Sequence, residues 1–169
     1  MNRWLLLVIA LITLALLVNI YVPATASHEQ SAFSGLAKVT NRSEIGKCIA
    51  PDRLQICWNR KSVMQFETND PRLTGEATLI FNSIFTKLPY AGRMWGNFHL
   101  VSDGGSWDGT WKGLIDTQGN TRFVGVGQGR ESYKGMAIRW TMEPSRPGWL
   151  AEMSVNGSII PVHSPSRKR

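Results

Sequence analysis

The sequence predicts an all-β fold, an antiparallel closed barrel of about eight strands preceded by one N-terminal hydrophobic helix. From about residue 54 onward, short runs of alternating polar and apolar residues lie between clusters of Gly, Pro, Asn and Asp, spaced roughly ten to fifteen residues apart. The 7 Trp and 16 Gly favour twisted, tightly turned sheets over helices. A sandwich is the alternative architecture for such a strand pattern.

The strands are expected wherever an alternating run lies between two turn signals. Asn69-Asp70-Pro71, Asp103-Gly104-Gly105 and Gln118-Gly119-Asn120 are three of these turns, because Asn, Asp, Gly and Pro each favour turn conformations. The predicted strands cover residues 54–60, 62–68, 73–85, 93–102, 105–116, 121–129, 135–143 and 149–160.

Side chains alternate between the two faces of a strand, and here one face is aromatic, aliphatic and glycine while the other is mostly polar. We assign the first face to the interior, where a bulky ring can use the space that a glycine leaves open. The same pattern can fill a barrel completely or leave an apolar cavity. The residues expected to line such a cavity are Phe81, Met94, Phe98, Trp107, Trp111, Gln128, Met136, Trp140, Trp149 and Met153.

The N-terminus has the pattern of a secretory signal. A cationic start ending at Arg3 precedes an almost wholly apolar run over residues 4–22, and Ala24-Thr25-Ala26 offers a cleavage site. The run is also long enough to cross a hydrocarbon core, so it can remain as a membrane anchor. Either way the protein is expected to be exported: secreted, periplasmic or at the cell surface. The predicted organisation is a signal or anchor (1–26), a flexible spacer (27–44), the barrel domain (45–161) and a basic disordered tail (162–169).

Export makes the two cysteines interpretable, since paired thiols tend to oxidise outside the cytoplasm. Cys48 and Cys57 enclose Pro51-Asp52, a plausible turn, so a disulfide across a local hairpin is expected. Two separate buried thiols are the alternative. The spacing excludes a C-x-x-C redox or metal motif.

The formal charge of +7 permits attraction to anionic surfaces. Apart from the tail Arg167-Lys168-Arg169, however, the basic residues are scattered, whereas a nucleic-acid site concentrates them on one face. No nucleic-acid partner is therefore expected. Membrane contact is expected only through the N-terminal segment if it is uncleaved, and homo-oligomerisation is left open.

Four motifs stand out along the predicted strands: Asp70-Pro71-Arg72-Leu73-Thr74-Gly75, Trp95-Gly96-x-Phe98-x-Leu100, Asp103-Gly104-Gly105-Ser106-Trp107-Asp108-Gly109-Thr110-Trp111-x-Gly113 and Gly127-x-Gly129-x-x-x-Tyr133-x-Gly135-Met136. Together they resemble a known group, the uncharacterised exported bacterial proteins whose barrel is similar to plant allene oxide cyclase and dirigent proteins. The resemblance implies an eight-stranded, calycin-like barrel, often oligomeric, whose interior holds a hydrophobic small molecule and can steer a cyclisation without a cofactor. No catalytic residue transfers, because the matching residues are glycines, tryptophans and turn residues.

Residues able to do acid–base or metal chemistry are few. His99 is expected on the outer face with no second His at ligand spacing, so neither a metal site nor a cofactor is predicted. Gln65 and Glu67, in phase with Val63, are placed inward. A buried Glu67 would have a raised pKa and is the one weak catalytic candidate; the alternative is that Glu67 faces solvent.

Three functions follow from these patterns. The first is a non-catalytic barrel that binds a small hydrophobic ligand in its lumen. The second is a cofactor-independent isomerase or cyclase of the allene oxide cyclase type, using the same cavity. The third is a packed barrel that acts through its surface as an envelope or protein-interaction module. An empty cavity of roughly several hundred cubic ångströms separates the first two from the third, because a solid interior would exclude both ligand hypotheses.

Overall fold

The computed structural model describes residues 30–43, 46–88, 90–145 and 151–162. The predicted export segment, Trp149 and most of the basic tail lie outside these residues. Within them, no helix is long and apolar enough to cross a membrane. The described strands are β1 (Ser31–Ser43), β2 (Lys47–Ile49), β3 (Leu54–Thr68), β4 (Gly75–Thr86), β5 (Gly92–Ser102), β6 (Gly105–Ile115), β7 (Thr121–Gly129), β8 (Met136–Pro144) and β9 (Glu152–Pro161). Two 3-10 turns join them, η2 (Pro71–Leu73) and η3 (Glu131–Tyr133).

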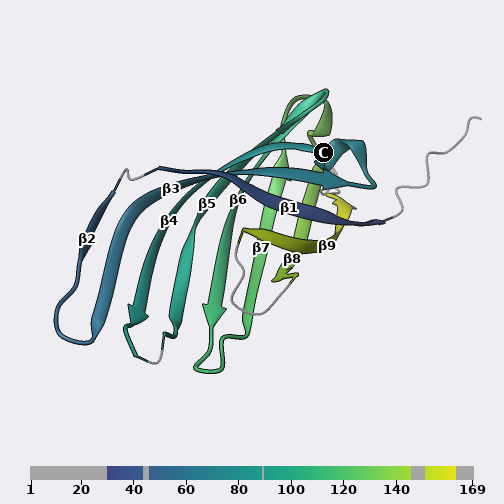
Figure 1. The fold of residues 1–169 in the computed structure, drawn as a ribbon. Coiled ribbons are helices and arrows are strands. Elements are labelled where there is room, and N and C mark those ends of the chain that lie inside the picture. Colours follow the sequence, from purple (N-terminus) through teal and green to yellow (C-terminus); the bar gives the residue numbers. More distant parts are fainter. Residues whose placement is uncertain (1–29, 44–45, 89, 146–150, 163–169) are drawn as a thin grey trace, which may run out of the picture.

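The strands form one antiparallel sheet in the order β1-β9-β8-β7-β6-β5-β4-β3-β2, and an additional β1–β3 pairing closes eight of them into a barrel (Figure 1). The predicted all-β closed barrel is confirmed. Strand β2 stands outside this circuit and pairs with the first part of β3. As a result β3 has two neighbours on one edge: β2 along its beginning and β1 along residues 61–68.

The first barrel strand was expected elsewhere. Residues 31–43, predicted as a flexible spacer, form β1, and its interior positions Phe33 and Ala37 are fully packed. Its many small and polar residues hide the alternation. The two strands predicted at 54–60 and 62–68 are instead the single strand β3, which bulges between Cys57 and Arg60 without turning. Residues 31–43 thus belong to the barrel, which begins before the predicted boundary at residue 45.

The barrel strands are strongly tilted. A row of paired residues can be followed around the barrel from Cys57 of β3 back to the same strand. It returns at Thr68, 11 positions later (68 minus 57). In a closed barrel, such an offset between the two ends of a row accompanies strand tilt. Because of this offset, the two ends of the barrel are built from different parts of each strand. The row is Cys57, Ser83, Met94, Gly113, Phe123, Met142, Val155, Gly35 and Thr68.

Aromatic rings and glycines alternate between neighbouring strands on the interior face. A Cβ atom on Gly125 would lie 2.2 Å from the Trp140 ring of the adjacent strand, and one on Gly113 would lie 2.1 Å from the Phe123 ring. Both glycines therefore make room for a ring beside them. One complete row shows the pattern: Arg60, Phe81, Gly96, Trp111, Gly125, Trp140, Gly157 and Phe33.

The predicted faces of β7 are inverted. Gln128 was placed inside with Val124 and Val126, but Gln128 is exposed and Val126 is 59% exposed. Phe123 and the strand's glycines face the interior instead. Valine is the more apolar residue, but a Cβ atom on Gly125 would lie 2.2 Å from the Trp140 ring and one on Gly127 would lie 2.8 Å from the Phe98 ring, so these interior positions have room only for glycine.

The predicted face of β3 is also inverted over residues 63–67. Met64 and Phe66 are buried in the core, whereas the Glu67 side chain is 55% exposed. Its carboxylate pairs with Lys38 Nζ at 3.3 Å on the outer surface. The bulge between Cys57 and Arg60 shifts the alternation by one residue, so a reading in phase with Val63 selects the wrong side. Glu67 therefore lacks the buried position on which its prediction as a catalytic candidate depends.

Candidate functional site

One end of the barrel is closed by the residues of the sequence motifs. Trp107 is completely buried (0% exposed), and its indole Nε1 donates to the carbonyl oxygen of Arg72 at 2.8 Å. The Trp107 ring stacks on Tyr133, with ring centroids 5.1 Å apart. The Tyr133 hydroxyl in turn donates to the carbonyl oxygen of Asp103. These contacts tie three turns together over the end of the lumen.

Charged groups at this closed end are paired. Arg72 Nη2 lies 2.6 Å from Asp70 Oδ2 and also donates to Ser31 Oγ at 2.9 Å. The hydrogen bond from the Arg72 side chain is the main cause that lowers the pKa of Asp70. Asp70 Oδ1 also accepts from the Arg72 backbone N–H, which caps η2. The closed end is thus a stabilising plug.

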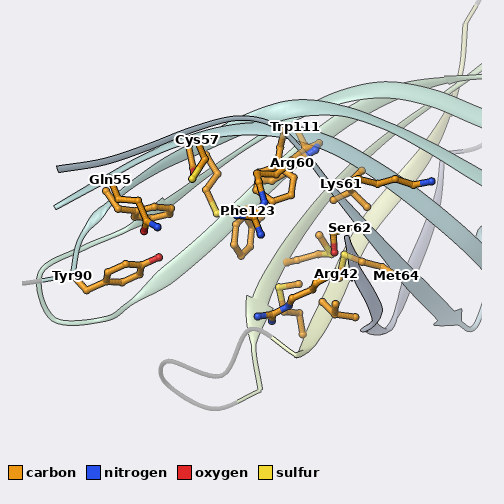
Figure 2. Close-up of a pocket in the computed structure, with 18 residues that line it drawn as sticks. Arg42, Gln55, Cys57, Arg60, Lys61, Ser62, Met64, Tyr90, Trp111 and Phe123 are labelled. Carbon is orange, nitrogen blue, oxygen red and sulfur yellow. The ribbon is translucent and has the colours of Figure 1, made fainter. Parts of the chain in front are cut away.

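The opposite end is open. There the first part of β3 pairs with β2, and Figure 1 shows β3 to β7 continuing past the ends of β8 and β9. A cavity of about 230 Å³ lies between the barrel strands at this open end, which we call the mouth (Figure 2). Its lining comes from β1, β3 to β9 and the β4–β5 connection: Val39, Arg42, Gln55, Cys57, Arg60, Lys61, Ser62, Met64, Leu79, Phe81, Ser83, Phe85, Tyr90, Met94, Trp111, Phe123, Met142 and Met153.

Aromatic rings make much of the cavity wall. Phe81 and Phe123 flank Trp111, with ring centroids 5.6 and 5.8 Å from the indole. Nearer the rim, Tyr90 stacks on Phe85 at 4.8 Å. Burial raises the pKa of Tyr90, and the nearby charge of Arg42 opposes that shift. The cavity therefore has an apolar floor and a phenol at its rim.

The charged residues among the described lining are all cations: Arg42, Arg60 and Lys61. Figure 2 shows Lys61 extending away from the other labelled side chains, so the two arginines are the cations that bear on the cavity. Arg60 Nε is buried and has no hydrogen-bond partner in the described part of the chain. Its Nη1 donates to Cys48 Sγ at 3.4 Å, a weak acceptor.

The Cys48–Cys57 disulfide holds one wall of the mouth. The predicted pair is bonded across the β2–β3 hairpin, with Cα atoms 4.1 Å apart, and Cys57 itself lines the cavity. The hairpin turn is held in addition by Lys87 Nζ, which donates to the carbonyl oxygens of Ala50 and Asp52 at 3.2 and 2.8 Å. The disulfide thus fixes the strand that carries Arg60.

The residues predicted to line one cavity lie in different parts of the barrel. Phe98 and Trp140 border a void of about 10 Å³ deep in the core, Trp107 is in the closed end and Gln128 is outside. Met136 packs near Arg72, whose Nη1 lies 3.9 Å from the sulfur. Those found at the open mouth are Phe81, Met94, Trp111 and Met153.

Sequence reasoning missed the polar half of the mouth. Arg42 falls in the predicted spacer, and Arg60 is the last residue of the predicted strand 54–60, with no interior role assigned to it. Phe123 was excluded by the inverted reading of β7. The bulge, on which Arg60 depends, has one signal in retrospect: Asn59, a residue type that tolerates its positive φ of 53°.

The outer surface carries one further cluster. His99 Nδ1 lies 2.7 Å from Asp108 Oδ1, and Arg130 Nε donates to Asp108 Oδ2 at 2.9 Å. The hydrogen bond with His99, followed by that from Arg130, lowers the pKa of Asp108. The cluster is solvent-exposed and lies outside the cavity. Across the described ranges, no group of three or more His, Cys, Asp or Glu side chains is placed to hold a metal ion.

Fold and site together define a class: a closed eight-stranded antiparallel β-barrel with a plugged end and an apolar mouth edged by arginines. Comparison of the chain with models of protein families and with curated proteins found no match. The barrel is compatible with the resemblance to allene oxide cyclase-like proteins, which rests on the sequence motifs.

Proposed function

We propose that this protein is an exported barrel that binds a small hydrophobic molecule in the open mouth of its lumen without transforming it. The observation that carries the proposal is the 230 Å³ cavity with its aromatic and methionine lining. This volume is somewhat below the usual range of about 300 to 1,000 Å³ for ligand pockets, so a small ligand fits best.

The polarity of the lining supports binding over catalysis. A general acid or base works best with a pKa near the operating pH, and His, Asp and Glu most often fill that role. The described lining holds arginines, a lysine and Tyr90, whose pKa burial raises still further from neutrality. Glu67, the candidate for a cyclase, faces solvent.

Export is supported by two features of different kinds. The N-terminal pattern is that of a secretory signal. The disulfide at the mouth is a bond that persists in oxidising compartments.

The binding proposal is tested with the neutral dye N-phenyl-1-naphthylamine, which fluoresces in apolar surroundings. Ser83 is buried in the cavity wall, so Ser83→Phe should fill the space and abolish the fluorescence gain. Ile80→Phe, on the outer face of the same strand, is the matched control and should bind like the unmodified protein. Equal dye binding by Ser83→Phe, or a clean apo mass in native mass spectrometry together with no dye binding, would contradict the proposal.

A further inference from the structure

Arg60 occupies an unusual position for a cation. It stands on the interior face of β3, paired with Phe81, at the head of the row that continues through Trp111 and Trp140. Charged residues are rarely placed inside a barrel unless they are paired. Arg60 is thus held against apolar rings.

Three other arginines have the carboxylate partner that Arg60 lacks. Arg72 pairs with Asp70, Arg122 with Glu143 and Arg130 with Asp108, each within 4 Å. No described carboxylate lies within that distance of Arg60, and its buried Nε has no acceptor. A buried donor without a partner costs about 1 to 3 kcal/mol, so its retention points to an acceptor supplied from outside the chain.

Arg42 provides a second cation on β1, the strand paired with β3. It is paired with Ser62 on β1 and β3, and both residues line the cavity. Arg42 is exposed, so its charge lies at the rim, where it opposes the rise that burial causes in the pKa of Tyr90. Two arginines and no described carboxylate give the mouth a positive potential, which attracts and orients an anion.

We infer that the ligand is a small amphipathic carboxylate whose head group binds Arg60, with Arg42 as a secondary contact, and whose apolar body lies among Phe81, Trp111 and Phe123. A guanidinium presents its donors in a planar fork that matches a carboxylate. This inference rests on the proposed function, since it specifies the chemistry of the molecule bound in the same cavity.

The test compares octanoate with 1-octanol by isothermal titration calorimetry on the purified protein. Arg60→Gln should weaken octanoate binding by about tenfold, the loss of one charge-assisted pair, and leave 1-octanol binding within about twofold. Arg60→Lys should fall between the two, because it keeps the charge but loses the fork. Arg93→Gln, on the outer face over Trp95, is the matched control and should change neither affinity.

The outcomes separate the two proposals. Unchanged octanoate binding by Arg60→Gln would overturn the anionic head group, while continued binding of 1-octanol would leave the hydrophobic site standing. Failure of the unmodified protein to bind either compound would overturn both. Should Arg60→Gln not fold, a salt titration decides: octanoate binding should weaken from about 20 to 500 mM NaCl while 1-octanol binding does not, and a salt-independent octanoate affinity would reject the inference.

Discussion

Two arginines at opposite ends of one barrel have opposite surroundings. Arg72, at the closed end, binds Asp70 and Ser31 and accepts through its carbonyl from Trp107. Arg60, at the open mouth, has a buried Nε with no described partner. The difference indicates that the closed end is organised for stability, whereas the mouth retains an unsatisfied group of the kind that proteins keep for function.

The largest effect is expected from Trp107→Ala. Removing the fully buried ring that stacks on Tyr133 should lower the free energy of unfolding by about 3 to 5 kcal/mol, measured by urea denaturation. Trp95→Ala, whose ring is 37% exposed on the outer face, is the control and should cost less than about 1 kcal/mol. Similar losses of unfolding free energy for both variants would contradict the assignment of the closed end as the stabilising part of the barrel.

A loss of about 2 to 3 kcal/mol is expected when the Cys48–Cys57 bond is removed by the double substitution Cys48→Ser and Cys57→Ser, because the bond closes a short loop. Octanoate affinity should fall as well, since the bond holds the strand that carries Arg60. Thermal melts and calorimetry check the two effects, and reduction of the unmodified protein should reproduce them. Full binding by the double variant would show that the mouth does not depend on the disulfide.

Asp70→Asn should lower the free energy of unfolding by about 1 to 2 kcal/mol at neutral pH, because Asn can still cap η2 but loses the charged hydrogen bonds with Arg72. Its pKa is lowered in the folded protein, so its contribution is present above the unfolded value near pH 4 and is lost as the pH falls through the folded value. The two proteins should therefore converge in stability below about pH 4. A constant difference down to pH 2 would contradict this assignment; Glu67→Gln, an exposed pair, is the control.

The smallest effect is expected from Arg60→Met. Because Arg60 Nε is buried without a partner, its replacement by an apolar chain of similar length should leave the ligand-free protein as stable as before or up to about 1 kcal/mol more stable. Differential scanning fluorimetry checks this, with Arg93→Met as the surface control. A loss above about 1 kcal/mol would mean that Arg60 is a structural residue.

The sequence predicts the barrel because its interior signal is repeated. Trp107, Trp111, Trp140 and their neighbouring glycines mark the same face on successive strands, so one misplaced strand does not change the fold. The hairpin between Cys48 and Cys57 is predictable because its determinants are local.

The mouth is less predictable because it depends on two non-local features. The bulge at Asn59 inverts the faces of β3, and Arg60 becomes an interior residue only through it. The opening exists because the pairing of β1 with β3 ends at Lys61, whereas β2 pairs with residues 56–58 of β3. Neither the bulge nor the change of partner has a marker in residue periodicity. The strongest motif spans both ends of the lumen, since its Trp107 lies in the plug and its Trp111 lines the cavity, and so it does not single out the mouth.

The central claim is that ligand enters at the open mouth and that the closed end takes no part. The indole N–H groups of Trp111 and Trp107 report on the two ends of one lumen, since the first donates to Asn97 and the second to Arg72. In a two-dimensional ¹H–¹⁵N spectrum, titration with octanoate should move the Trp111 indole signal and leave that of Trp107 in place. Movement of Trp107 with Trp111 unchanged, or of neither while an outer-face indole such as that of Trp95 moves, would contradict the account.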